Sequence, residues 1–138
     1  MSETTPSLLA ATPILRMFDV PSAKTFYIDY LGFKLDWEHR YEPDLPLYMQ
    51  VSSGECVLHL SEHYGDGTPG SAIRIEVRGL EAFHARLSEK SFPYSRPGLD
   101  AEGDELTVWD PSGNRIVFFE RRTKGAEGGE NGDDVASP

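Results

Sequence analysis

The sequence predicts an α+β fold built from two βαβββ modules, residues 11–62 and 71–121. Segments with strand-like alternation and segments with helical periodicity occur twice in the same order, and matching segments lie about 57–60 residues apart. A stretch rich in turn residues, residues 63–70, separates the two series. This stretch is therefore the predicted connection between the modules.

The first module opens with an apolar strand, predicted at residues 11–18, and a helix predicted at residues 21–31. Pro21 lies in the first turn of this helix and Gly32 lies just past its end, as helix start and stop signals prefer. The apolar residues of the helix fall on one face: Ala23, Phe26, Tyr27, Tyr30 and Leu31. Three strands are then predicted at residues 33–39, 46–52 and 55–61, the last two joined by a Ser53-Gly54 turn.

The second module repeats this order. A strand is predicted at residues 71–78 and a helix at residues 80–87, followed by strands at residues 92–96, 104–109 and 114–121. Residues 1–10 form a predicted flexible N-terminal arm, outside the domain at residues 11–122. Residues 123–138 have almost no apolar side chains to offset their ordering entropy, which predicts a disordered tail.

Composition limits the partners that this chain can have. Its 138 residues suit one domain, and its net charge of −10, from 23 acidic and 13 basic residues, repels nucleic acid phosphates. No apolar run approaches the roughly 18 residues that span a bilayer. Cys56 is the only cysteine, so no internal disulfide can form. Together with the lack of a signal-peptide pattern, this predicts a cytoplasmic protein that binds neither nucleic acid nor membrane.

Alternation sorts the strand residues onto two faces, because neighbours in a strand point to opposite sides. One face is uniformly aliphatic, with Leu58, Leu60 and Ile116 among its members, and we expect it to pack on the helices. The other face is mixed and holds Tyr48, Gln50, Val57, His59, Ser61, Ala72, Arg74, Glu76, Arg115, Val117 and Phe119. Such a face either meets solvent, as in many antiparallel sheets, or lines a binding site.

Two segments resemble a known family. The segment ATPILRMFDVPSAKTFYIDYLGF, residues 11–33, and the segment LTVWDPSGNRIVFFE, residues 106–120, resemble the opening and closing signatures of the glyoxalase/bleomycin resistance/dioxygenase superfamily. The resemblance covers residues 11–121. It implies that the two modules form a curved mixed sheet around a cleft, and that the mixed face lines the cleft.

The resemblance also assigns four metal-ligand positions, which in this sequence are occupied by Thr12, His59, Ala72 and Val117. Only His59 has the kind of side chain that these metalloenzymes use, whereas a catalytic ion needs about three protein ligands. We therefore expect no metal, no cofactor and no catalytic residue in this chain.

The bleomycin-resistance branch of the superfamily fits this pattern, since its members are small acidic homodimers that sequester a cationic aromatic antibiotic without a metal. The resemblance thus predicts a metal-free small-molecule binding protein and a homodimer. The expected ligand-binding residues are Trp37, Tyr48, His59, Arg74, Glu76, Trp109 and Phe119. Trp37 and Trp109 suit the core equally well, and Arg74 favours an anionic or carbonyl-bearing ligand, so the ligand stays open. The alternative is a metal-dependent enzyme of the glyoxalase or dioxygenase type.

Overall fold

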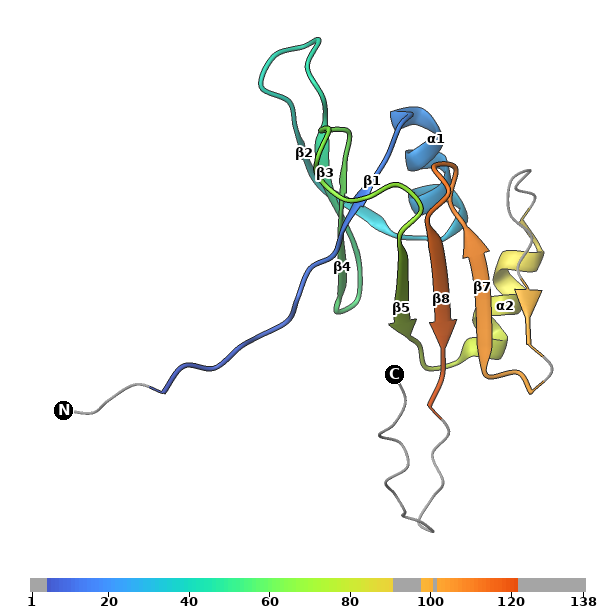
Figure 1. Cartoon of the computed structure of the whole chain (residues 1–138). Helices are drawn as coiled ribbons and strands as arrows, with labels where there is room; N and C mark the ends of the chain where they lie inside the picture. The colour runs from blue at the N-terminus through green and yellow to red at the C-terminus, as the bar shows by residue number, and fades with distance from the viewer. Residues whose placement is uncertain (1–4, 91–97, 101, 122–138) are drawn as a thin grey trace.

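The computed structural model describes residues 5–90, 98–100 and 102–121, and it confirms the α+β class and the two βαβββ modules (Figure 1). The first module contains β1 (Ile14–Arg16), α1 (Val20–Lys24), the π-helix η1 (Thr25–Tyr30), β2 (Lys34–His39), β3 (Tyr48–Ser53) and β4 (Cys56–Ser61). The second contains β5 (Ala72–Glu76), α2 (Leu80–Ser88), β6 (Gly98–Leu99), β7 (Glu105–Trp109) and β8 (Arg115–Phe119). The predicted strand at 92–96 and the predicted tail at 123–138 lie outside the described residues.

Each module forms its own four-stranded mixed sheet. The N-terminal sheet has the strand order β1-β4-β3-β2, and the C-terminal sheet has the equivalent order β5-β8-β7-β6. In both, the first strand of the module pairs in parallel with the last, while the remaining pairs are antiparallel. The repeat predicted from the sequence is therefore a repeat of topology.

The helix of the first module begins at Val20, one residue before the predicted start. Asp19 is the N-cap, and its Oδ2 accepts hydrogen bonds from the backbone N–H of Ser22 (3.0 Å) and from the Ser22 hydroxyl (2.6 Å). The helix is α-helical only to Lys24 and continues as a π-helix over residues 25–30, which the sequence did not indicate. It ends at Gly32, whose φ of 88° suits a residue without a side chain.

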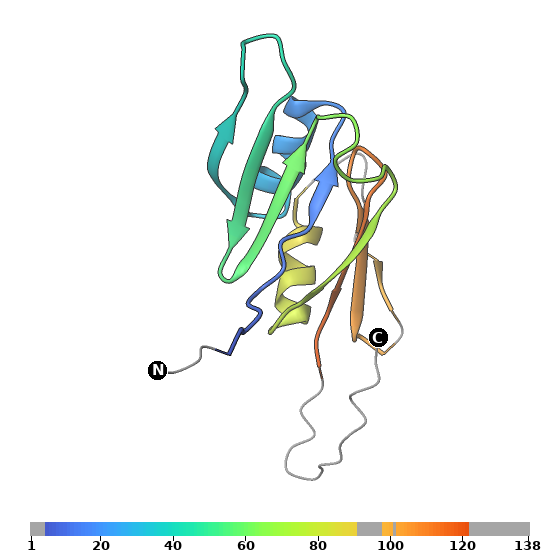
Figure 2. The ribbon, with the colours of Figure 1, turned by 60° about the vertical axis from the view of Figure 1, so that its left-hand side comes forward.

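The inner faces of both sheets and the buried faces of the helices form one core. Its members come from all parts of the fold: Leu15, Phe26, Tyr27, Met49, Val51, Leu58, Leu60, Leu80, Leu87, Leu106, Val108, Ile116 and Phe118. Figure 2 shows the helices behind the N-terminal sheet, on the side that faces this core. The aliphatic faces assigned from alternation are thus the ones that pack on the helices. In the described ranges, no helix is long and apolar enough to cross a membrane.

Polar contacts tie the two modules together. The buried Tyr27 hydroxyl donates a hydrogen bond to Asp110 Oδ2 (2.6 Å), in the turn between β7 and β8. From the same turn, Asn114 Nδ2 donates to the backbone carbonyl of Arg16 (2.9 Å). Lys90, after α2, donates to the carbonyls of Asp29 and Tyr30 (both 2.9 Å). These contacts orient the two sheets relative to each other.

Candidate functional site

The open face of the N-terminal sheet is the side turned away from the core, and strand register brings three predicted site residues together on it. His59 on β4 lies directly beside Gln50 on β3, and Gln50 lies beside Trp37 on β2. Tyr48 lies two residues before Gln50 on β3, and therefore on the same face. Figure 2 views the sheet from this open side.

Trp37, Tyr48 and His59 form an aromatic cluster on this face. The Trp37 and Tyr48 rings are stacked at 10° with their centroids 6.0 Å apart. His59 meets both rings edge-on, with centroid distances of 5.4 Å to Trp37 and 5.1 Å to Tyr48. Because Trp37 keeps 43% of its surface exposed, the cluster presents a flat aromatic surface on which a planar ligand can stack.

A chain of hydrogen bonds runs beneath this aromatic cluster. The Tyr48 hydroxyl lies 2.7 Å from His59 Nδ1, and His59 Nε2 lies 2.9 Å from Gln50 Oε1. Gln50 Nε2 in turn donates to Asp36 Oδ2 (3.0 Å). Since the amide nitrogen of Gln50 points to the carboxylate, its oxygen faces the imidazole, and His59 Nε2 must donate.

The direction of this chain decides what Tyr48 offers to a ligand. Burial lowers the pKa of His59, so the imidazole is held in its neutral form. A neutral ring that donates from Nε2 accepts at Nδ1, and the Tyr48 proton is therefore directed inward. The pKa of Asp36 is lowered by hydrogen bonds from Gln50 and Ser52, which keeps the far end of the chain anionic. The Tyr48 oxygen is left as a hydrogen-bond acceptor.

The open face of the C-terminal sheet carries charge around one ring. The guanidinium carbon of Arg74 lies 4.3 Å from the centroid of the Phe119 ring, and that of Arg121 lies 5.5 Å from it. Each arginine is also ion-paired, Arg74 with Glu105 (3.2 Å) and Arg121 with Glu76 (3.2 Å). The carboxylate of Glu76, which we expected to meet a ligand, is thus already beside a cation of this chain.

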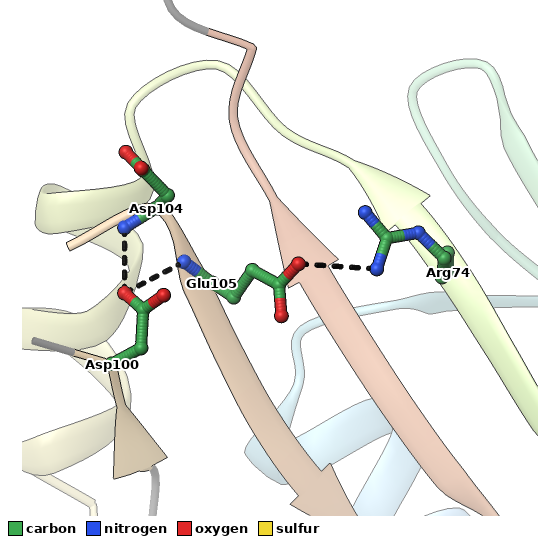
Figure 3. Close-up of polar contacts among 4 residues, drawn as sticks. All are labelled: Arg74, Asp100, Asp104 and Glu105. Atoms are coloured by element: carbon green, nitrogen blue, oxygen red, sulfur yellow. Dashed lines mark hydrogen bonds and ion pairs between the residues drawn. The ribbon is translucent and has the colours of Figure 1, made fainter. Parts of the chain in front are cut away.

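Figure 3 shows how the partner of Arg74 is positioned. Asp100 Oδ1 accepts hydrogen bonds from the backbone N–H groups of Asp104 (2.8 Å) and Glu105 (3.2 Å) at the start of β7. Glu105 then reaches across β8 to Arg74 on β5. Both side chains of this pair are about two-fifths exposed, so the pair orders the face but adds little stability.

Both tryptophans lie outside the core, so the core placement that the sequence left open for them is excluded. Trp109 is 50% exposed and lies beside Arg115 on the open face of the C-terminal sheet. Trp37 belongs to the aromatic cluster of the other sheet. The predicted site residues are therefore divided between two faces, with Trp37, Tyr48 and His59 on one and Arg74, Glu76, Trp109 and Phe119 on the other.

Two residues of the predicted mixed face are buried. Ser61 has no exposed surface, because its hydroxyl donates to Asp66 Oδ2 (2.9 Å) in the loop that follows β4 and accepts from the backbone N–H of His63 (3.0 Å). Val117 is only 5% exposed, at the centre of the C-terminal sheet. Neither residue is available to a ligand.

Gln50 and Asp36 are site residues that the sequence prediction missed. Alternation placed Gln50 on the mixed face, but nothing in the sequence marks it as the partner of His59. Asp36 reaches the open face because a β-bulge between Leu35 and Trp37 shifts the register of β2. No sequence signal marks this bulge.

The positions assigned to metal ligands do not fit a metal site. Thr12 lies before β1, and the register partner of His59 is Ile14. In the C-terminal sheet, Ala72 pairs with Arg115 and Val117 with Arg74, so cations stand beside these two positions. No group of three or more histidine, cysteine, aspartate or glutamate residues suited to a metal occurs in the part of the chain that the structure describes. This donor set does not match the three or so protein ligands of a catalytic metal.

The two open faces of one chain point in different directions. Figure 2 shows the N-terminal sheet with the helices behind it, and Figure 3 shows the open face of the C-terminal sheet, again with helices behind. Because both inner faces belong to one core, the open faces lie on the outside of the molecule. A single chain therefore presents two separate surfaces.

Comparisons with known proteins agree with this architecture. Residues 7–125 match a family described as "Glyoxalase superfamily protein". A bleomycin-binding protein of Streptomyces verticillus, solved with copper(II)-bleomycin, is 29% identical, with a TM-score of 0.62 over 86% of this chain and 100% of that one. A bleomycin resistance determinant encoded on transposon Tn5 is 22% identical, with a TM-score of 0.62 over 84% and 100%.

An enzyme with the same fold also occurs among the solved structures. The trypanothione-dependent glyoxalase I of Leishmania major is 21% identical, with a TM-score of 0.64 over 83% of this chain and 87% of that one. At this identity the likeness shows the fold alone. No curated protein sequence matches the chain.

Proposed function

The chain belongs to the glyoxalase superfamily, and on this premise we propose that it binds a small aromatic molecule, a bleomycin-type or related antibiotic, without the help of a metal ion. The observation that carries the proposal is the exposed aromatic cluster of Trp37, Tyr48 and His59. The Streptomyces verticillus protein, at 29% identity over its whole length, supports the class of ligand. Sequestration requires affinity and no chemistry, so it does not depend on the metal ligands that this chain lacks at the family's positions.

The chemistry of the cluster suits a planar ligand that also donates hydrogen bonds. Stacking on an aromatic ring contributes roughly 0.5–1.5 kcal/mol beyond the burial of apolar area. The Tyr48 oxygen, whose proton is directed to His59, accepts a hydrogen bond from an amide or amine of the ligand. The net charge of −10 attracts a cationic ligand at long range.

We also propose that the protein forms a homodimer in which the N-terminal sheet of one copy faces the C-terminal sheet of the other. This arrangement is supported by the two open faces, which point in different directions in one chain, so the N-terminal sheet does not face the C-terminal sheet of its own chain. It would bring Trp109 and Phe119 of one copy opposite Trp37 and Tyr48 of the other and form the expected cleft. A cytoplasmic location goes with this proposal, since Cys56 is the only cysteine.

Sedimentation velocity at tens of micromolar tests the dimer. We expect a single species with twice the mass of the chain. A monomer across this concentration range would remove the shared cleft from the proposal and leave only the face of the N-terminal sheet.

Calorimetric titration with metal-free bleomycin tests the ligand class. We expect saturable binding with a micromolar or lower Kd, and we expect Trp37→Leu to weaken it about tenfold because the stacking surface is lost. Tyr41→Phe is the matched control, since Tyr41 is 74% exposed and contacts His39 at the far end of β2. An absence of heat up to 100 μM bleomycin would exclude this drug, and equal binding by Trp37→Leu would exclude the aromatic cluster as its site.

A further inference from the structure

Arg16 lies on the open face of the N-terminal sheet, and it forms no ion pair with any residue that the structure describes. It occupies β1 in register with Ser61 on β4, which in turn lies beside Tyr48 on β3. Its Nε atom is buried and has no hydrogen-bond partner among the described residues. Its guanidinium carbon lies over two aromatic rings, 4.9 Å from the centroid of Phe18 and 5.9 Å from that of Tyr64.

The backbone around Arg16 is held firmly. Its carbonyl accepts a hydrogen bond from Asn114 Nδ2 (2.9 Å), and the next backbone N–H, of Met17, donates to Ser61 (2.8 Å). The loop between the modules packs against it so closely that a Cβ on Gly67 would lie 3.0 Å from the Arg16 nitrogen. The guanidinium therefore extends from a fixed point.

Among the described residues, no hydrogen-bond acceptor lies within reach of the buried Nε–H of Arg16. Asp66, in the loop that follows β4, accepts a hydrogen bond from Ser61 and forms no ion pair with Arg16 in the described ranges. A buried donor without a partner costs free energy that a hydrogen-bond acceptor recovers. The rings of Phe18 and Tyr64 lie against the guanidinium, and the planar fork of N–H donors matches the two oxygens of a carboxylate.

We propose that Arg16 is a subsite for a carboxylate group of the ligand, next to the aromatic cluster. This inference rests on the proposed function, because it names a second group on the molecule that the cluster binds. Tyr48 stands two strands away from Arg16, which is about 10 Å at the usual spacing of about 4.8 Å between strands. The ligand is therefore an aromatic compound that carries a carboxylate about that far from its stacked ring, in addition to the amide or amine that donates to Tyr48.

Two probes of matched shape test the subsite: biphenyl-4-carboxylate, in which a ring that can stack and a carboxylate lie at opposite ends, and its neutral isostere biphenyl-4-carboxamide. Calorimetry should show that the carboxylate binds about tenfold more tightly than the amide, as one charge-assisted hydrogen-bonded pair gives. In Arg16→Gln this preference should disappear, while the amide keeps its Kd within twofold. Arg86→Gln is the control, because it removes the same charge and a similar ring contact, with Phe83, on α2.

A preference for the carboxylate that survives in Arg16→Gln, or no preference in the unaltered protein, would overturn the subsite. If neither probe binds at 1 mM, the aromatic cluster is refuted as a binding surface for such compounds. The affinity of Arg16 for a carboxylate is then tested separately. Acetate alone is then titrated at constant ionic strength while the Nε–H resonance of Arg16 is followed by NMR. A saturable shift that is missing at Arg86 supports the subsite, and a flat response up to 100 mM acetate refutes it.

Discussion

The hydrogen bond between Tyr27 and Asp110 joins the two modules, and its contribution to the free energy of unfolding can be measured. The Tyr27 hydroxyl is fully buried and donates to Asp110 Oδ2 at 2.6 Å. Asp110 also accepts from the backbone N–H groups of Ser112 (2.9 Å) and Asn114 (2.8 Å) and from Asn114 Nδ2 (2.9 Å). Burial and the nearby carboxylate raise the pKa of Tyr27, so the phenol stays protonated and donates.

Replacing Tyr27 with phenylalanine removes one hydrogen bond to a charged group and keeps the ring. Such a bond contributes roughly 1.5–3 kcal/mol, so Tyr27→Phe should lower the free energy of unfolding by about 2 kcal/mol. Asp110→Asn should cost more, about 3 kcal/mol, because its amide nitrogen cannot accept from either Tyr27 or Asn114. The double variant should cost less than the sum of the two, since both single changes remove the same bond.

Urea denaturation followed by tryptophan fluorescence measures these differences. Tyr41→Phe serves as the control and should change the free energy of unfolding by less than about 0.5 kcal/mol, because its hydroxyl is on the surface. A Tyr27→Phe protein as stable as this control would refute the role of the bond. So would strict additivity of Tyr27→Phe and Asp110→Asn.

Two further predictions concern His59 and the loop between the modules. Because burial holds the pKa of His59 below its ordinary value of about 6.5, the folded protein binds fewer protons than the unfolded chain just below that pH. Stability should therefore fall as pH drops through this window, and His59→Gln should reduce the slope in pH-dependent denaturation. Gly67→Ala should cost about 2 kcal/mol or more, since φ is +70° and the new Cβ would lie 2.8 Å from the Ile14 carbonyl oxygen. Gly103→Ala, with φ of +76° and open space, should cost about 1 kcal/mol; equal losses at the two glycines would contradict the close packing.

Periodicity and turn chemistry predicted most of the fold. Asp19, Pro21 and Gly32 bracket the first helix as their backbone preferences require, and each predicted strand in the described ranges has a counterpart in the structure. The π-helical turn over residues 25–30 was not predicted, because the aromatic residues Phe26 and Tyr27 suit an α-helix equally well. Local sequence does not distinguish the two hydrogen-bonding patterns.

The sequence predicted only those parts of the candidate site in which strand alternation determines the face on which a side chain lies. Tyr48 and His59 share a face because each lies on a regular strand, and the sequence placed them together. Asp36 joins them through a bulge, and Ser61 is covered by a loop, neither of which strand alternation can show. The contact between Tyr27 and Asp110 joins residues 83 positions apart, and it depends on how the modules pack.

The direct test of metal-free binding is calorimetry with metal-free bleomycin before and after exhaustive removal of divalent ions. Residual metal in the protein is measured by mass spectrometry in both samples. We predict the same Kd in the two titrations, because the aromatic cluster and its hydrogen-bonded chain need no ion. Binding that disappears with the metal and returns when one equivalent of zinc or copper is added would contradict the account.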